Sequence, residues 1–162
     1  MRIGIGYDAH RLVPGRPLIL GGVRIEFEQG LDGHSDADVL VHAVCDAVLG
    51  AGAAGDIGIH FPDTDPSWAG ICSLVLLSKT VDIVAERGFS IENIDATLLL
   101  ERPKVAPYCR MMVENIARAA GLSLQRVSVK ATTNEGLGWI GRGEGIGAMA
   151  VALLERKPDF TQ

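Results

Sequence analysis

The sequence predicts a single α+β domain in which three helices cover one face of a mixed four-stranded sheet, with a small hairpin beside it. The chain has 162 residues, the size of one ordinary domain, and 48% of them are hydrophobic. Segments with alternating apolar residues are interspersed with segments of helical period. Their order is strand, hairpin, helix, helix, strand, helix, strand, strand, which is typical of a mixed sheet with its helices on one face. We therefore treat residues 1–162 as one domain.

The first strand carries chemistry on one of its faces. Residues 2–10 alternate between apolar side chains and a second set made of two glycines, Asp8 and His10. Because side chains on a strand point alternately to opposite faces, the acid and the imidazole project from the same side. This face is a candidate functional surface.

A hairpin and a helix follow the first strand. Apolar triplets at residues 18–20 and 23–25 flank a pair of glycines, which is a signal for a two-residue hairpin turn. Ser35 and Asp38 have the spacing of a capping box in front of an apolar-periodic segment. The spacing predicts a helix over residues 36–49 with Ser35 as its N-cap.

The second half of the chain supplies the remaining elements. Residues 50–66 are rich in glycine, aspartate and proline, and form a loop long enough to be functional. Small side chains alternate along the last strand, and we expect that face to be covered by other copies of the chain (Ala148, Ala150 and Ala152). The predicted elements after residue 66 are helices over 71–87 and 108–120 and strands over 91–100, 127–132 and 146–154.

Composition excludes several classes of function. A net charge of −5 and a pI near 5.3 argue against a nucleic-acid-binding protein, which usually carries a concentrated basic face. The three cysteines have no Cys-x-x-Cys spacing, which argues against a disulfide scaffold or a cysteine zinc site. The longest apolar stretch is far shorter than the roughly 20 residues that cross a bilayer. We expect a cytoplasmic protein without nucleic-acid or membrane partners.

A candidate metal site combines the first strand with the first helix. Asp8 and His10 can grip one cation from the strand, and His42 on the helix supplies a third ligand. One carboxylate and two imidazoles suit Zn²⁺ with its fourth position open, which is the catalytic arrangement. We expect Asp38 and Asp46, one turn to either side, to orient the His42 ring. The alternative is a solvated acid beside two core histidines, but the combination favours the metal.

Other side chains suit a phosphorylated polyol. His34 and Ser35 lie at a helix start, where free amide groups favour an anion. Asp63 and Asp65 lie between prolines in a stiff loop that can accept hydrogen bonds from hydroxyl groups, and Asp56 precedes them. For each aspartate the alternative is an ordinary turn or helix-start acid.

Cations and hydroxyl groups follow two later strands. Lys104 supplies a positive charge after one strand, and residues 130–135 supply hydroxyl groups and the carboxylate of Glu135 after another. That carboxylate has the oxygen chemistry for Mg²⁺ shared with phosphates. The glycine-rich segment around Arg142 lacks the lysine and hydroxyl of a P-loop, so we interpret it as a glycine turn.

Taken together, these motifs resemble the 2-C-methyl-D-erythritol 2,4-cyclodiphosphate synthase family, and the resemblance covers the whole chain in order. The motifs that carry it are Asp8-Ala9-His10, His34-Ser35-Asp36, Gly55-Asp56-Ile57-Gly58, Phe61-Pro62-Asp63-Thr64-Asp65, Lys130-Ala131-Thr132-Thr133 and Gly141-Arg142-Gly143-Glu144-Gly145.

The resemblance implies a homotrimer with active sites at the subunit interfaces. Its reaction would convert 4-diphosphocytidyl-2-C-methyl-D-erythritol 2-phosphate into 2-C-methyl-D-erythritol 2,4-cyclodiphosphate and CMP, in non-mevalonate isoprenoid biosynthesis. Two other functions stay open on the residues alone: a non-catalytic trimer that binds an isoprenoid diphosphate or a nucleotide, and a zinc-dependent phosphohydrolase.

The resemblance also implies roles for individual residues. Zn²⁺ would be held by Asp8, His10 and His42. The residues implied in catalysis are His34, Thr133 and Glu135, the last through Mg²⁺ or Mn²⁺ bound to the substrate diphosphate. The residues implied in substrate binding are Ser35, Asp56, Gly58, Phe61, Asp63, Asp65, Lys104, Ala131, Thr132, Trp139 and Arg142. Arg142 and Glu144 would line a central channel of the trimer that could hold an isoprenoid diphosphate.

The sequence departs from the family pattern at two places. Trp139 stands where the family more often has phenylalanine, and Val105-Ala106 stand where larger residues would line a cytosine pocket.

Overall fold

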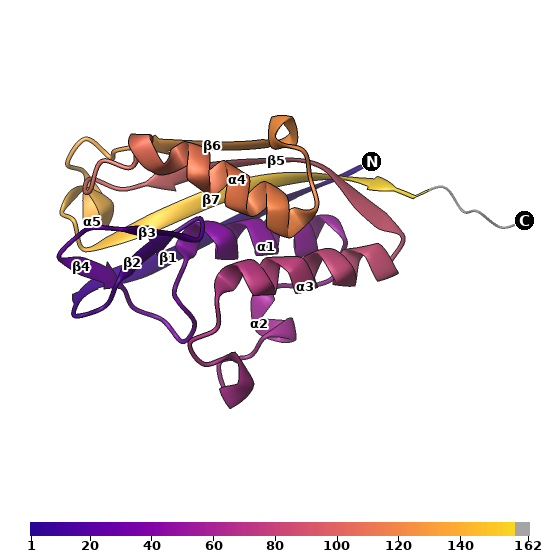
Figure 1. The fold of residues 1–162 in the computed structure, drawn as a ribbon, viewed down its shortest axis with the longest axis horizontal. Helices are drawn as coiled ribbons and strands as arrows, with labels where there is room; N and C mark the ends of the chain where they lie inside the picture. The colour runs from indigo at the N-terminus through magenta and orange to yellow at the C-terminus, as the bar shows by residue number, and fades with distance from the viewer. Residues whose placement is uncertain (158–162) are drawn as a thin grey trace, which may run out of the picture.

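A five-stranded sheet in the order β4-β1-β7-β5-β6 is the frame of the protein (Figure 1). The computed structural model describes residues 1–157, so residues 158–162 of the expected domain lie outside the described part. β7 pairs antiparallel with both β1 and β5, whereas β5 and β6 are parallel, so the sheet is mixed as predicted. The strands are β1 (Arg2–Pro14), β4 (Gln29–Leu31), β5 (Phe89–Leu99), β6 (Val127–Thr132) and β7 (Gly145–Arg156).

The expected strand count of four was one too low. The four long strands are those that the sequence predicts, and the fifth is β4, which pairs with the end of β1. β4 has three residues, and its central Gly30 lies where an added Cβ would be 2.3 Å from the Pro17 carbonyl oxygen. A strand of three residues centred on a glycine has no alternating apolar pattern from which it could be predicted.

Three helices pack on one face of the sheet, as expected. They are α1 (Val39–Ala51), α3 (Ser73–Glu86) and α4 (Cys109–Ala120), and the hairpin is formed by β2 (Leu18–Leu20) and β3 (Val23–Ile25). Segments that we expected to be irregular contain short helices. These are α2 (Ile57–His60), α5 (Gly138–Gly141), and the single turns η1 (Pro66–Trp68), η2 (Ala106–Tyr108) and η3 (Leu124–Arg126).

The N-cap of α1 is Asp38, and the prediction of Ser35 was wrong. The Asp38 carboxylate is fully buried and accepts the N–H groups of Gly21 (2.9 Å), Gly22 (2.6 Å) and Val41 (3.2 Å). One side chain therefore caps the helix and holds the turn of the β2–β3 hairpin. This double role explains why the helix begins at Val39 and three residues later than expected.

The small side chains of β1 and β7 let α1 lie unusually close to the sheet. A Cβ added at Gly6 would be 1.9 Å from the Ala43 carbonyl oxygen, and one added at Gly4 would be 2.0 Å from that of Ala47. The opposite residues on β7 share this face, because cross-strand partners point to the same side. Ala148, Ala150 and Ala152 are accordingly buried at 0–1% exposure inside the chain. The expectation that this face meets other copies was therefore wrong.

The opposite face of the sheet is the one left open. It carries five large apolar side chains that are partly or mainly exposed in the single chain (Ile3, Ile5, Tyr7, Met149 and Val151). Among the described residues no helix covers this face, since α1, α3 and α4 all lie on the other side (Figure 1). None of the helices in the described part of the chain is long and apolar enough to cross a membrane.

Candidate active site

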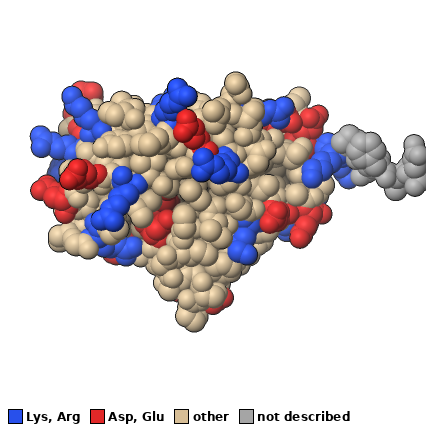
Figure 2. All heavy atoms as spheres, in the orientation of Figure 1, with Lys and Arg blue, Asp and Glu red and all other residues tan. Residues whose placement is uncertain are grey.

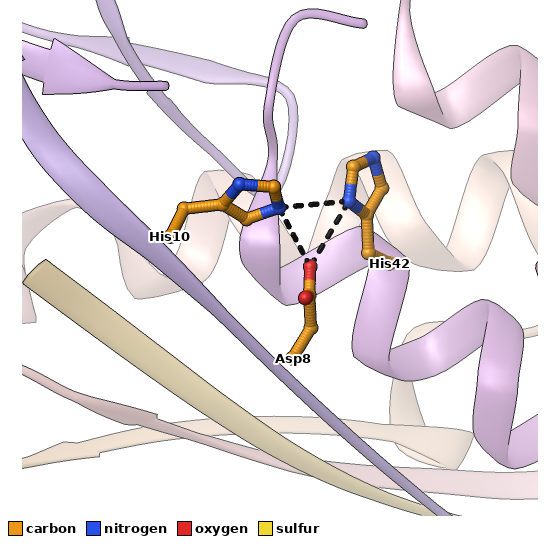
Figure 3. A group of neighbouring side chains, drawn as sticks. All are labelled: Asp8, His10 and His42. Atoms are coloured by element: carbon orange, nitrogen blue, oxygen red, sulfur yellow. Dashed lines mark hydrogen bonds and ion pairs between the residues drawn. The ribbon is translucent and has the colours of Figure 1, made fainter. Parts of the chain in front are cut away.

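Three predicted metal ligands meet where β1 passes beneath α1 (Figure 3). Asp8 and His10 project from β1 toward α1, which supplies His42. His10 Nε2 lies 2.8 Å from Asp8 Oδ2, and His42 Nδ1 lies 3.0 Å from the same oxygen. The two ring nitrogens are 3.3 Å apart. The strand alternation places the first two side chains, and the close packing of α1 brings the third to them.

The three atoms fit a divalent metal ion. Zinc bonds to nitrogen and carboxylate oxygen are about 2.0–2.2 Å long, so ligands at tetrahedral angles are about 3.3 Å apart. The observed separations of 2.8–3.3 Å are within about half an ångström of that value. The side chains keep 13–26% of their surface exposed, which leaves an open side toward solvent. A site of this kind can hold an ion and present it to a ligand.

The charges of the triad are tuned by mutual contact. Burial alone would raise the pKa of Asp8, but hydrogen bonds and charge from His10 and His42 outweigh it and hold that pKa well below its usual range. Burial alone would lower the pKa of His10, but the Asp8 carboxylate and the Asp32 carbonyl raise it. Asp8 is therefore an anion ready to bind a cation, and protons compete for the same place.

Each imidazole is held by a second contact on its far nitrogen. His10 Nδ1 donates to the Asp32 carbonyl oxygen at 2.6 Å, which leaves its Nε2 facing Asp8. His42 Nε2 lies 2.9 Å from Ser73 Oγ and 3.1 Å from Ser35 Oγ. The loop between β4 and α1 and the first residue of α3 thus orient the two rings.

Asp38 and Asp46 do not orient His42, so that prediction was wrong. The Asp38 carboxylate turns to the hairpin, and Asp46 Oδ1 accepts the N–H of Ile57 at 2.8 Å. Helical spacing brings side chains to one face, but these two carboxylates satisfy backbone donors that the sequence pattern does not reveal. The ring is instead held by Ser73, which sequence reasoning missed. Its position at the first turn of a predicted helix was the available signal.

A pocket of about 460 Å³ opens beside the metal ligands. Besides the ligands His10 and His42, five predicted site residues line it (His34, Ser35, Gly58, Phe61 and Asp63). The other lining residues are apolar and were not predicted as site residues (Gly33, Ile57, Pro62, Trp68, Ile71 and Leu76). The Phe61 and Trp68 rings meet edge to face, with 5.2 Å between their centroids. The projection formed by α2 and η1, at the bottom of Figure 2, is mostly free of charged side chains. The pocket thus combines polar and apolar side chains in its lining.

Asp56 and Asp65 lie nearby but are used as helix caps. Asp56 Oδ1 accepts the N–H of Ile59 at 3.0 Å at the start of α2, and Asp65 Oδ1 accepts that of Ser67 at 2.9 Å at the start of η1. The backbone contact from Ser67 lowers the pKa of Asp65. Neither residue lines the pocket beside the metal ligands. The other carboxylate oxygen of each residue, Oδ2, can still accept a hydrogen bond from a ligand.

A second hollow of about 250 Å³ lies between the loop after β5 and the end of β6. It brings together four predicted residues (Lys104, Ala131, Thr132 and Thr133) and the departure Val105-Ala106. Glu101 holds the two segments together, because its carboxylate accepts the N–H groups of Asn134 (2.9 Å) and Gly136 (3.2 Å). Glu135 stands exposed at a left-handed turn (φ 51°), and its carboxylate accepts from Thr133 Oγ1 at 3.1 Å.

The remaining predicted residues lie away from both hollows. Arg142 Nε donates to Glu144 Oε1 at 2.6 Å on the surface, in the turn between α5 and the start of β7. Trp139 packs near Gly145 and lines a separate shallow depression with His10. Within the described residues, no side chain lines both the metal-side pocket and the Lys104 hollow.

The chain is similar to named proteins over nearly its whole length. The curated 2-C-methyl-D-erythritol 2,4-cyclodiphosphate synthase of Syntrophobacter fumaroxidans is 59% identical over 154 residues, which covers 95% of this chain and 97% of the relative. A solved 2C-methyl-D-erythritol-2,4-cyclodiphosphate synthase, in a bound form with CDP, matches with a TM-score of 0.87 and 41% identity over 95% of this chain and 100% of that one.

A longer protein contains the same fold. The bifunctional IspDF from Campylobacter jejuni matches with a TM-score of 0.92 and 42% identity, over 96% of this chain but only 42% of that chain. This chain therefore spans less than half of that protein. The family model described as the YgbB family matches residues 1–155, nearly the whole sequence. The chain belongs to the YgbB family.

Proposed function

We propose that this protein is an enzyme that closes a cyclic diphosphate, converting 4-diphosphocytidyl-2-C-methyl-D-erythritol 2-phosphate into 2-C-methyl-D-erythritol 2,4-cyclodiphosphate and CMP. The observation that carries the proposal is the Asp8–His10–His42 triad at the edge of a pocket of about 460 Å³. The names of the curated relatives, at 59–60% identity over nearly the full chain, support this product.

The donor set supports Zn²⁺ in the triad. Two imidazoles and one carboxylate with an open side are the ligands of catalytic zinc sites. When bound there, the ion would neutralise phosphate charge next to the reacting phosphorus. The exposed Glu135 carboxylate offers the oxygen chemistry that Mg²⁺ or Mn²⁺ prefers, and we propose it as the contact for an ion that arrives with the diphosphate.

The reaction requires the protein to position the substrate and does not require a protein nucleophile. The 2-phosphate of the substrate attacks its own β-phosphorus, a P–O bond forms, and the P–O bond to CMP breaks. CMP leaves as a phosphate whose second pKa is about 6, so it needs little help from an acid. Intramolecular attack can gain effective molarities of about 10⁵–10⁸ M when the substrate is folded correctly.

The pocket residues are suited to this folding. His34 and Ser35 lie beside the metal ligands, where they can bind the erythritol phosphates. Asp63 can accept hydrogen bonds from the polyol, with Asp56 and Asp65 acting through their second oxygens. Lys104 and Thr133 can hold the cytidine diphosphate, and the hollow that they line supports this role.

We propose a homotrimer whose active sites are split between neighbouring chains. The open sheet face with Ile3, Ile5 and Tyr7 supports association, because exposed apolar patches of this kind usually mark an interface. No residue of the described part, 1–157, lines both hollows, which supports a split site. In such a ring, Arg142 and Glu144 would face a central channel that could hold an isoprenoid diphosphate.

Complementation tests the split site. His42→Ala and Lys104→Ala chains should each be inactive, and refolding them together at equal ratio should leave about a quarter of interfaces with both halves intact. Activity should rise toward that fraction of wild type. Mixed trimers that form and stay inactive would place both halves in one chain.

Phosphorus-31 NMR of the product tests the reaction itself. The purified protein, supplied with Zn²⁺ and Mg²⁺, should give the two coupled resonances of a cyclic diphosphate together with CMP. The His42→Ala protein serves as the control and should give neither product. A linear bisphosphate with CMP would instead show hydrolysis, and would refute ring closure.

A further inference from the structure

The hydroxyl of Ser73 is buried directly behind a metal ligand. Ser73 is the first residue of α3 and is fully buried. Its Oγ lies 2.9 Å from His42 Nε2, the nitrogen that faces away from Asp8. Helix α3 therefore contacts a metal ligand through the Ser73 hydroxyl, although it supplies none of the three ligands.

Asp36 decides which way the Ser73 hydroxyl points. One oxygen of the Asp36 carboxylate accepts the backbone N–H of Ser73 at 3.0 Å, and the other accepts the Ser73 hydroxyl in a short hydrogen bond. An ionised carboxylate has only acceptor sites, and a hydroxyl has one proton to give. Because that proton goes to Asp36, Ser73 Oγ can only accept from His42.

This hydrogen-bond pattern determines the tautomer of the His42 ring. If Ser73 Oγ accepts, then His42 Nε2 carries a proton, and Nδ1 is left with its lone pair. Nδ1 is the nitrogen that lies 3.0 Å from Asp8 and 3.3 Å from His10 Nε2. Ser35 Oγ, at 3.1 Å from Nε2, is a second acceptor, and it also receives the N–H of Ala37.

We propose that Ser73, held by Asp36, is a positioning residue of the metal site: it fixes His42 in the tautomer that offers Nδ1 to the ion. The inference deepens the proposed function and rests on the metal assignment within it. The two histidines are thereby set by different means, since His10 donates its far N–H to a backbone carbonyl, whereas His42 depends on a pair of side chains.

The pair also ties the pocket loop to the metal ligands. The Asp36 N–H donates to the Ile71 carbonyl at 3.1 Å, and the Gly70 N–H donates to the His34 carbonyl at 2.9 Å. The chain segments on either side of the pocket are thus joined next to Ser73. A substitution that breaks the Asp36–Ser73 contact should therefore affect the metal site more than the packing of the sheet.

Zinc affinity in two near-isosteric variants tests the proposal. Ser73→Ala removes the acceptor and should weaken zinc binding by about 10–100-fold, the usual cost of losing such an outer contact. Asp36→Asn should weaken it at least as much, because an amide N–H can donate to Ser73 and free the hydroxyl to donate to His42. The control is Thr80→Ala, which removes a buried hydroxyl about two turns further along α3. It should bind zinc within twofold of wild type.

Affinity is measured by competition with a chelator of known zinc affinity, with the melting temperature of each metal-free protein recorded beside it. In the zinc-loaded wild type, the His42 Nε2–H should give a slowly exchanging ¹H–¹⁵N resonance, and its exchange should quicken in Ser73→Ala. Because Asp36→Asn keeps the Ser73 side chain, it carries the test if the alanine variant fails to fold.

The outcomes separate this inference from the proposed function. If wild type binds zinc and both variants bind it within twofold of wild type, the Ser73 assignment is overturned and the metal site stands. The assignment is also overturned if Thr80→Ala weakens zinc binding as much as Ser73→Ala. If wild type itself binds no zinc, the metal assignment fails, and the inference fails with it.

Discussion

The substitution Gly6→Ala should damage both the fold and the metal site, because one contact serves both. A Cβ at residue 6 would lie 1.9 Å from the Ala43 carbonyl oxygen, whereas ordinary contact begins near 3.4 Å. Helix α1 would have to withdraw from β1 by about 1.5 Å. Overpacking of this kind typically costs about 1–3 kcal/mol. In a protein of this size that loss lowers the melting temperature by roughly 3–10 °C.

The same displacement should loosen the triad. Residue 43 is the neighbour of His42, and residue 6 lies two positions before Asp8, so the shift acts almost directly on their 3.0 Å separation. A separation nearer 4.5 Å exceeds the roughly 3.3 Å that tetrahedral zinc ligands require. We expect zinc affinity, measured by chelator competition, to fall by at least about tenfold.

The control for Gly6→Ala is Gly50→Ala on the same helix. The nearest atom to an added Cβ there is 4.0 Å away, so the methyl group has room. It should stabilise α1 by up to about 0.5–1 kcal/mol through helix propensity and leave zinc binding unchanged. A Gly6→Ala protein with the melting temperature and zinc affinity of wild type would refute the close-packing argument.

Three further predictions concern stability and assembly. Asp38→Ala leaves three backbone N–H donors without their partner and should cost about 3 kcal/mol or more in chemical denaturation, while unchanged stability would show that water replaces the carboxylate. Ile5→Asp on the open sheet face should convert a trimer of the 17.2 kDa chain into monomers by light scattering, whereas Ile59→Asp, equally exposed on α2, should not; a trimeric Ile5→Asp protein would place the interface elsewhere. The metal-free protein should melt at a lower temperature at pH 8 than at pH 5, because the pKa of His10 in the folded state is raised above 6.5, and burial raises that of Asp38 from 3.8 to about 6. Both groups bind a proton more tightly in the folded than in the unfolded state, so the stability that they contribute is lost as the pH rises through these values. A melting temperature that rises from pH 5 to pH 8 would contradict this prediction.

The long elements could be predicted from the sequence because each has a local signal. Strand β6 and the β2–β3 hairpin have the predicted bounds, and the helices differ mainly at their first residues. The triad was also within reach, since Asp8 and His10 share a strand face and His42 lies on the following helix. Local period and spacing determine such features.

The contacts that could not be predicted from the sequence join residues far apart along the chain. Asp38 was expected beside His42 but serves a hairpin turn 17 residues away, and Ser73 reaches the ring across 31 residues. The alanines of β7 were expected at an interface because periodicity separates two faces without saying which one the helices cover. Only tertiary packing decides these assignments.

Elemental zinc analysis of purified protein tests most directly the claim that Asp8, His10 and His42 hold the catalytic ion. Wild type should carry one zinc ion per chain, and His42→Ala should carry almost none while keeping its fold by circular dichroism. His60→Ala is the matched control, because this histidine bonds to the Ala54 carbonyl at 2.7 Å outside the triad, and it should keep its zinc. Full zinc occupancy in His42→Ala, or its loss in His60→Ala, would contradict the account.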